Sequence, residues 1–311
     1  MIDKTIKIGT RGSKLALYQA EAVQNAINNN FPQVKTEIVV IHSKGDKILD
    51  IALSKIGDKG LFTQELEDAL FNHKIDMAVH SLKDLPTDLP PGLEVSAVLK
   101  RGEVRDALVS TKKLSVNTLT PNLKIATSSL RRKSQLLKMN PDLNIIDIRG
   151  NVNTRLRKME EGYCDAMIMA ATGLQRLGLD KFIAQVIPAD IIIPAVSQGA
   201  IAIESNIENI EIKPIIDSIN DKETMRITKA ERVFLNTIEG GCQVPVGCYS
   251  SINGQDIEMC GFIAGVDGKE FLSHKVMGDI EKASTWGKEL ALKLIDQGAK
   301  DVLDQVRNHN I

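Results

Sequence analysis

The stretch IGTRGSKL, residues 8–15, decides the fold, because an apolar strand end runs through a turn rich in glycine and hydroxyl groups into the start of a helix. The stretch ATSSLRR, residues 126–132, has the same order of strand end, hydroxyl-rich turn and helix. In both stretches an arginine lies beside the turn. Strands that alternate with helices are typical of α/β proteins. The two stretches therefore predict two α/β lobes, although their similarity is weak and does not establish a repeat.

The first two hundred residues continue this alternation. Short β-rich runs lie at residues 5–8, 37–41, 77–79, 124–126, 144–148 and 166–169. Helical periodicity occurs at residues 13–29, 63–71, 129–139 and 152–160. Several of these helices open on Ser, Thr or Asn, whose side chains accept hydrogen bonds from the first N–H groups of a helix. We therefore predict an α/β fold for this part of the chain.

The chain is predicted to cross twice between the two lobes. The turn signals at residues 100–103 mark the first crossing, and the strand-like run at residues 199–204 carries the chain back. Two crossings of this kind form a hinge. We expect lobe 1 at residues 1–99 and 200–218, and lobe 2 at residues 100–199. A long helix, two strands and a final helix from about residue 282 then predict a small α+β domain at residues 219–311.

The composition is that of an ordinary globular protein. Of the 311 residues, 43% are hydrophobic and 25% are charged, and the formal net charge is −1. This charge gives no overall attraction to nucleic acid or to anionic membranes. The sequence has neither a long apolar signal region nor an apolar run long enough to span a membrane, so we expect a cytoplasmic protein. Its four cysteines lack a CxxC pair, and nothing indicates a metal, nucleotide or pyridoxal cofactor.

Arginines are concentrated in lobe 2, in a pattern typical of anion binding. Six of them lie close together in sequence: Arg131, Arg132, Arg149, Arg155, Arg157 and Arg176. Guanidinium groups bind carboxylates and phosphates through paired hydrogen bonds, and helix N-termini add backbone donors. A solvated helix face is the alternative, and we keep it for Arg157. Aromatic residues make up only 4% of the chain, so a small polyanion fits this cluster better than nucleic acid.

The stretch VHSLKDLP, residues 79–86, places polar side chains directly after an apolar strand. Open α/β sheets bind ligands at such strand ends. Asp84 is therefore a candidate for proton transfer or for the stabilisation of a developing cation. The alternative is an aspartate that only stabilises a turn. The apolar neighbours of His80 favour a packed histidine over a catalytic one.

The stretch EGGCQVPVG, residues 239–247, places a single thiol, Cys242, on a glycine-rich turn. Glycines let a large group approach the backbone, and Pro245 fixes φ, so the turn is suited to presenting the thiol. A tight turn with a small buried cysteine is the alternative. Residues 44–60 interleave glycine and lysine, which favours a mobile flap over a site.

Together these stretches resemble the porphobilinogen deaminase family, also called hydroxymethylbilane synthases. The blocks that carry the resemblance are IGTRGSKLAL at 8–17, VHSLKDLP at 79–86, TSSLRR at 127–132, RGNVNTR at 149–155 and GGCQVP at 240–245. The resemblance covers essentially the whole chain, and no functional block is missing. It implies a three-domain fold whose first two lobes are similar to type II periplasmic binding proteins.

The resemblance also implies a chemistry. Cys242 would carry, through a thioether, one dipyrromethane cofactor per chain, made from two units of the substrate. Such a transferase joins four porphobilinogens head to tail on this primer with loss of ammonia, and hydrolysis releases linear hydroxymethylbilane for haem biosynthesis. The family implies a monomer whose partner is the small-molecule substrate, with no nucleic acid and no membrane.

The site residues follow from the same resemblance, position by position. Asp84 matches the catalytic aspartate, which stabilises positive charge on the pyrroles and handles their protons. Besides Cys242 and Asp84, the positions that match cofactor-binding residues are Ser13, Lys83, Thr127, Ser129, Arg131, Arg132, Arg149, Gly150, Arg155 and Gln198. The positions that match substrate-binding residues are Arg11, Ser13, Ser128, Ser129, Arg149, Arg155 and Arg176. The expected lid includes Lys55, Lys59 and Phe62.

Proteins of two other classes are the alternatives. A non-catalytic two-lobed protein that binds small anions would share the lobes and the clustered arginines, but it has no use for a presented thiol. A nucleic-acid-binding module is disfavoured by the net charge and the low aromatic content, and it would bind with a strong dependence on salt.

Overall fold

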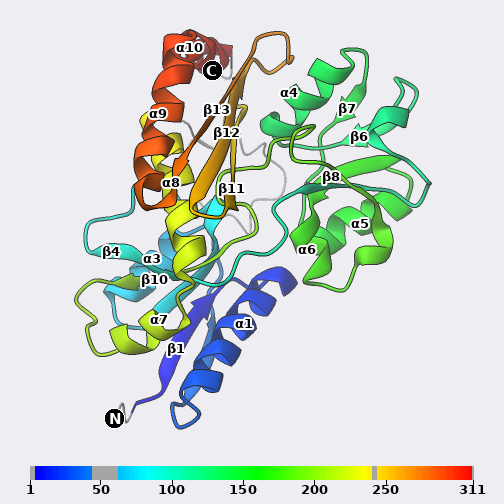
Figure 1. Ribbon diagram of the computed structural model, residues 1–311. Coiled ribbons are helices and arrows are strands. Elements are labelled where there is room, and N and C mark those ends of the chain that lie inside the picture. Colours follow the sequence, from blue (N-terminus) through cyan, green and yellow to red (C-terminus); the bar gives the residue numbers. More distant parts are fainter. Residues whose placement is uncertain (1–3, 44–61, 240–243, 310–311) are drawn as a thin grey trace. The chain divides into compact units, whose positions relative to one another are not determined.

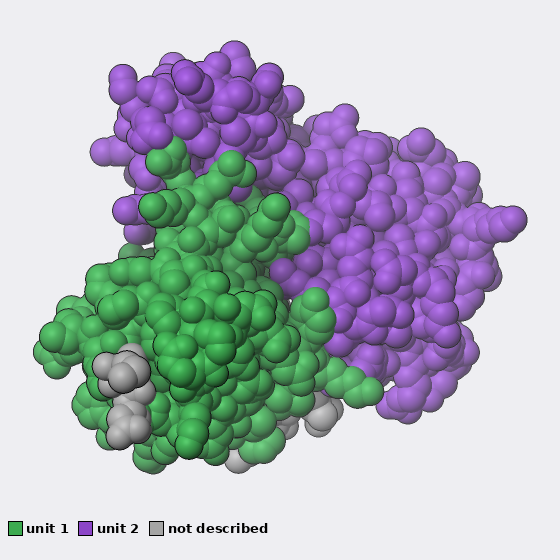
Figure 2. All heavy atoms as spheres, turned by 60° about the horizontal axis from the view of Figure 1, so that its bottom comes forward, with its two compact units in different colours: residues 1–51, 57–102, 199–226 green, residues 52–56, 103–198, 227–311 purple. Residues whose placement is uncertain are grey.

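The computed structural model describes residues 4–43, 62–239 and 244–309, and the chain divides into two compact units (Figure 2). Of these residues, unit 1 contains 4–43, 62–102 and 199–226, and unit 2 contains 103–198, 227–239 and 244–309. Within the described ranges the chain leaves unit 1 after Gly102 and returns at Gly199. The Gly102 N–H donates a hydrogen bond of 3.1 Å to the Gly199 carbonyl oxygen, so the two crossing segments meet.

Unit 1 contains a five-stranded sheet in the order β2-β1-β3-β10-β4. Figure 1 labels its strands β1, β4 and β10. Its strands are β1 (Ile6–Thr10), β2 (Thr36–Val40), β3 (Met77–Ser81), β4 (Leu93–Val98) and β10 (Ile201–Asn206). Strands β1, β2 and β3 are parallel, whereas β10 runs antiparallel to β3 and β4. Helices α1 (Lys14–Asn30) and α7 (Lys213–Ile219) pack against one face, and α3 (Gln64–Phe71) packs against the other.

Helix α1 shows how the sequence determines these elements. The Ser13 hydroxyl accepts a hydrogen bond of 3.2 Å from the Ala16 N–H and caps the helix. Ala20, Val23 and Ile27 follow at helical spacing, and all are fully buried against the sheet. The hydroxyl-rich turn predicted after β1 is therefore also the start of α1.

Unit 2 contains a second five-stranded sheet, in the order β7-β6-β8-β5-β9. Its strands are β5 (Asp106–Val109), β6 (Lys124–Ala126), β7 (Asn144–Ile146), β8 (Ala166–Ala170) and β9 (Ile183–Val186). Its helices are α4 (Leu130–Met139), α5 (Val152–Glu160) and α6 (Ala171–Gln175). Strands β6, β7 and β8 are parallel, and β5 runs antiparallel to β8 and β9.

The two five-stranded sheets have the same topology. In each, three parallel strands are followed in the sheet by an antiparallel strand that enters directly after a crossing, β10 in unit 1 and β5 in unit 2. Strand β1 with helix α1 and strand β6 with helix α4 occupy equivalent places. The two predicted α/β lobes are thus confirmed, and the weak similarity of their turns marks equivalent positions.

A three-stranded antiparallel sheet also belongs to unit 2. It consists of β11 (Val246–Asn253), β12 (Asp256–Ala264) and β13 (Phe271–Asp279), in that order. Helices α8 (Lys222–Thr237), α9 (Ala283–Asp296) and α10 (Ala299–His309) share its hydrophobic core. The sequence predicted one final helix, but the chain forms two, because Gly298 adopts a φ of +97° between them. Helix α8 begins in unit 1 and ends in unit 2.

The sequence prediction omitted β4, β5, β9, β11, α6 and α7, and its domain boundaries at 99/100, 199/200 and 218/219 stay a prediction. Four short 3₁₀ helices complete the described elements: Leu82–Asp84, Val116–Thr118, Asp180–Phe182 and Ile280–Lys282. None of the helices in the described ranges combines the length and the apolar character that a membrane crossing requires.

The tip of the β12–β13 hairpin lies directly against α4. Gly268 has a φ of +75°, and a Cβ on it would lie 2.3 Å from the Ser134 carbonyl oxygen and 2.7 Å from the Lys138 nitrogen. The Lys138 ammonium lies 3.5 Å from the centroid of the Phe271 ring, which stacks on Phe262. This close approach to the backbone of α4 requires glycine at position 268.

We predict that Gly268→Ala lowers the midpoint of thermal unfolding by several degrees more than Gly254→Ala does. Gly254 lies in the β11–β12 turn with a φ of +65°, and a Cβ on it would have no neighbour within 4 Å, so its substitution tests backbone strain alone. Strain costs about 1 kcal/mol, and steric overlap adds about 1–3 kcal/mol at Gly268. Equal shifts for the two variants, measured by calorimetry, would contradict the close contact with α4.

Candidate active site

The turn after β3 places Asp84 at the surface of unit 1. Residues Leu82–Asp84 form a 3₁₀ helix that is held by two buried leucines, Leu82 at 1% and Leu85 at 4% exposure. The Leu82 N–H donates to the Ala200 carbonyl oxygen at 3.1 Å. Lys83 is half-buried, and Asp84 is exposed. The Asp84 side chain makes no hydrogen bond or ion pair with any described residue, so within the described ranges it does not serve as a turn former.

The β1–α1 turn lies next to this strand end. The Gln19 side chain on α1 donates a hydrogen bond of 2.8 Å to the Ser81 hydroxyl at the end of β3. Arg11 lies in the turn, and its guanidinium carbon is 4.2 Å from the centroid of the Phe62 ring. Unit 1 thus brings Arg11, Ser13, Lys83 and Asp84 to one edge of its sheet. Of the expected lid, Phe62 contacts Arg11, whereas Lys55 and Lys59 lie outside the described residues.

His80 is a packed residue, as its apolar neighbours predicted. It is 6% exposed, and its Nε2 lies 2.9 Å from a carboxylate oxygen of Glu204, which is fully buried. Glu67 on α3 is also buried, and burial raises the pKa of its carboxyl above its usual value. Because His80, Glu204 and Glu67 are all buried inside unit 1, they support the end of β3 from within.

Unit 2 contains a buried cluster around Asp106. Its carboxylate accepts hydrogen bonds from Arg131 at 2.7 Å, from Arg132 at 2.8 Å and from Gln198 at 2.9 Å. Burial alone would raise the pKa of Asp106, but the two guanidinium groups hold it well below its usual range. The second terminal nitrogen of Arg131 donates to the Ile193 carbonyl oxygen at 2.6 Å, and that of Arg132 to the Ile168 carbonyl oxygen at 3.2 Å.

The sequence analysis did not identify Asp106, although it singled out all three of its partners. Arg132 Nε is buried and has no hydrogen-bonding partner among the described residues. This unpaired N–H group belongs to a cluster of two guanidinium groups and one carboxylate. The cluster therefore has both an unused N–H group and one uncompensated positive charge.

The turn between β6 and α4 offers further donors. The Ser128 hydroxyl pairs with the backbone N–H and carbonyl of Ile148, which joins the turn to the end of β7. The Thr127 hydroxyl accepts a hydrogen bond of 3.2 Å from the Ser129 N–H. Ser129 is the N-cap residue of α4, but its side chain makes no capping hydrogen bond. The first N–H groups of α4 thus lack the capping partner that Ser13 gives to α1.

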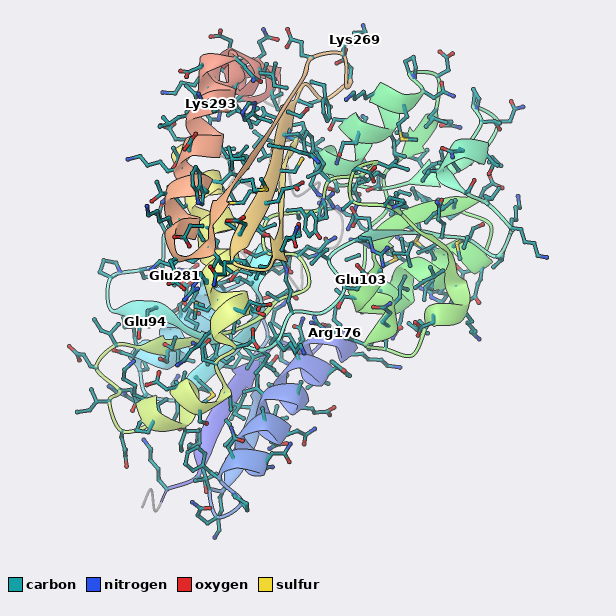
Figure 3. All side chains as sticks on the ribbon, viewed as in Figure 1. Glu94, Glu103, Arg176, Lys269, Glu281 and Lys293 are labelled. Carbon is teal, nitrogen blue, oxygen red and sulfur yellow. The ribbon has the colours of Figure 1, made fainter. Side chains whose placement is uncertain are left out.

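The remaining arginines of unit 2 differ in their surroundings. Arg149 is half-buried, and its side chain has no partner among the described residues. The Arg155 side chain donates to the Gly150 carbonyl oxygen at 2.7 Å, where Gly150 has a φ of +114°. Arg176 lies at the C-terminal end of α6 (Figure 3). Arg157 on α5 forms an exposed ion pair with Glu161, the C-cap residue of this helix, which confirms the solvated-face interpretation for Arg157.

The three described cysteines are poorly suited to react. Cys164 is 5% exposed, and burial raises the pKa of its thiol to about 11. Cys248 is fully buried, and burial raises the pKa of the half-buried Cys260. Cys242 lies outside the described residues.

Comparison with known proteins identifies the family. Residues 6–214 match the model described as porphobilinogen deaminase, dipyromethane cofactor binding domain, and residues 225–296 match the porphobilinogen deaminase C-terminal domain. The chain belongs to the porphobilinogen deaminase family. The family member from Syntrophomonas wolfei is 45% identical over 304 residues, which are 98% of this chain and 99% of that protein. The member from Chloroherpeton thalassium is 43% identical over 311 residues, with 99% of each chain covered.

The comparison with solved structures found binding proteins among the similar chains. The methionine binding protein MetQ has 14% sequence identity and a TM-score of 0.44, over 71% of this chain and 92% of that one. Membership of the porphobilinogen deaminase family rests on the sequence matches alone.

We predict that Cys164 resists thiol-specific labelling in the native protein at pH 8. A pKa of about 11 leaves only about one thiol in a thousand ionised at that pH, roughly a hundredfold fewer than for an unperturbed thiol. Mass spectrometry of peptides after timed labelling measures the rate, with the guanidinium-unfolded protein as the control. Equal labelling rates for Cys164 in the native and unfolded protein would show that its burial does not protect it.

Proposed function

We propose that this chain is a porphobilinogen deaminase, a transferase that joins porphobilinogen units head to tail with loss of ammonia and releases hydroxymethylbilane by hydrolysis. The observation that supports this most strongly is the match to the family over nearly the full chain, including both domain models. The arrangement of the described residues agrees with the demands of the reaction, which requires many carboxylates to be bound and positive charge to be stabilised.

The anion-binding groups fit the substrate and the cofactor. Each porphobilinogen carries an acetate and a propionate, and the dipyrromethane carries the same groups. Three hydrogen-bond donors are suited to carboxylates: the unpaired Arg132 Nε, the side chain of Arg149 and the first N–H groups of α4, which lack a side-chain cap. We assign cofactor binding to Ser13, Lys83, Asp84, Thr127, Ser129, Arg131, Arg132, Arg149, Gly150, Arg155 and Gln198. Substrate binding is assigned to Arg11, Ser13, Ser128, Ser129, Arg149, Arg155 and Arg176.

Asp84 is the proposed catalytic residue. Its exposed carboxylate has no described partner to neutralise it, so it is able to stabilise the positive charge that develops on a pyrrole as ammonia leaves. The same carboxylate is placed to hold a proton from the pyrrole nitrogen or to give one to the leaving amine. The buried leucines on either side of it fix the turn, so that the charge is held in place at little entropic cost.

Cys242 is the proposed attachment site for the cofactor. When bound, the dipyrromethane supplies the terminal pyrrole carbon to which the first porphobilinogen is joined. The glycine-rich sequence around Cys242 leaves room for such a group, whereas the described cysteines are buried or half-buried. The proposal includes a monomer in the cytoplasm, a lid that contains Lys55, Lys59 and Phe62, and the three domains predicted from the sequence.

We predict that the purified, denatured protein has a mass surplus equal to two substrate-derived pyrrole units, and that Cys242→Ser removes this surplus. A covalent group survives denaturation, whereas a bound ligand does not. Intact-mass spectrometry before and after incubation with porphobilinogen is the measurement. An unmodified mass under both conditions would favour a non-catalytic anion-binding protein instead.

We predict that Asp84→Ala keeps the fold and the cofactor mass but lowers kcat by about 10²–10⁴, the usual contribution of a group that transfers protons. Asp68→Asn, at an exposed carboxylate on α3 in the same unit, is the control and should have near-normal turnover. Steady-state kinetics with porphobilinogen, together with the intact mass, separate chemistry from cofactor loading. Near-normal turnover of Asp84→Ala would refute the catalytic assignment.

A further inference from the structure

Asp106 has surroundings that differ from those of an ordinary ion pair. Its carboxylate is fully buried, and each of its two oxygens accepts a hydrogen bond from a different arginine. Arg131 and Arg132 are themselves 5% and 7% exposed. Adjacent guanidinium groups repel one another when they are buried, so this pair depends on the carboxylate between them.

The charges of this cluster do not cancel. Two guanidinium groups carry two positive charges, and Asp106 supplies one negative charge. Gln198, the third donor to Asp106, is neutral. One positive charge therefore remains, and the buried Arg132 Nε still has an unused N–H group among the described residues. A buried net charge is unfavourable until a counter-charge arrives, and one singly charged carboxylate would neutralise the cluster.

We propose that Asp106 determines the charge specificity of this site. By cancelling one of the two guanidinium charges, it makes the Arg131–Arg132 pair a site for a singly charged carboxylate and a poor site for a dianion. The inference rests on the proposed function in one respect: the carboxylate that normally binds at this site belongs to porphobilinogen or to the cofactor. The charge count itself is a property of the described residues.

Without the Asp106 charge, the site should shift its preference from a singly charged carboxylate towards a dianion. In Asp106→Asn the side chain keeps nearly the same size, and its amide oxygen still accepts a hydrogen bond from one arginine. The cluster then carries two positive charges, which a dianion such as sulfate neutralises and a single propionate does not. A purely structural role for Asp106 would weaken the binding of both anions alike.

The experiment compares propionate and sulfate as ligands of the full chain with Cys242→Ser, which carries no covalent group at that position. Dissociation constants are obtained from the shift of the thermal unfolding midpoint with anion concentration, at constant ionic strength. Asp165→Asn in the same background is the matched control. It removes the same charge from unit 2, but Asp165 pairs with Lys112 in an exposed ion pair and not with the buried arginines.

We expect the ratio of the sulfate to the propionate dissociation constant to fall at least about tenfold in Asp106→Asn, as for other close charge pairs, and to stay unchanged in Asp165→Asn. An unchanged ratio in Asp106→Asn overturns the proposal. So does the absence of any stabilisation by propionate in the Cys242→Ser parent.

A second variant keeps the test decisive if Asp106→Asn does not fold. Arg132→Gln leaves a neutral Asp106–Arg131 pair, so propionate should stabilise this variant less than the Cys242→Ser parent, with only the other anion-binding groups left to contribute. Stabilisation by propionate equal to that of the parent would refute the charge count. The deaminase function is tested separately by the intact mass of the wild-type chain. If the wild-type chain acquires the pyrrole units while the ratio of the sulfate to the propionate dissociation constant stays unchanged in Asp106→Asn, only this inference is refuted.

Discussion

The buried carboxylate of Asp106 is the interaction on which the organisation of unit 2 depends. It joins the start of β5, helix α4 and residue 198 just before the return crossing. An isolated carboxylate in this place would be strongly destabilising, and so would two unpaired guanidinium groups. Each of these charges can be buried because an opposite charge lies beside it. The ion pairs therefore fix β5 to α4, the helix whose first N–H groups can bind anions.

In unit 1, the turn equivalent to that between β6 and α4 is held by neutral hydrogen bonds. Its β1–α1 turn is capped by Ser13 and joined to the end of β3 through Gln19 and Ser81, with no buried arginine. The carboxylate at this edge, Asp84, is exposed. The buried Arg131–Arg132 pair thus gives unit 2 a cationic edge at the start of α4, whereas the edge of unit 1 combines Arg11 and Lys83 with the exposed carboxylate of Asp84. One edge is suited to binding carboxylates and the other also to stabilising a cation, and a condensation of pyrroles with loss of ammonia needs both.

Much of this could be predicted from local sequence patterns. The helices with clear periodicity and a polar cap, such as α1 and α5, were placed to within about one residue. The short strands β5 and β9 were missed, because four residues give no measurable period and their burial comes from neighbours far along the chain. Asp106 was missed for a related reason: its partners lie 25, 26 and 92 residues away. Only the folded sheet shows that Arg131 and Arg132 share one carboxylate.

The two hairpin turns of the small sheet have unequal tolerance for added sequence. Both Gly254 and Gly268 adopt left-handed backbone conformations, but Gly268 lies against the backbone of α4, and Gly254 has open space around it. An inserted peptide tag or a spectroscopic label needs an exposed turn whose neighbours do not have to move. The β11–β12 turn meets this requirement. It is therefore the place on this sheet where a reporter could be attached without displacing the helix that carries Arg131 and Arg132.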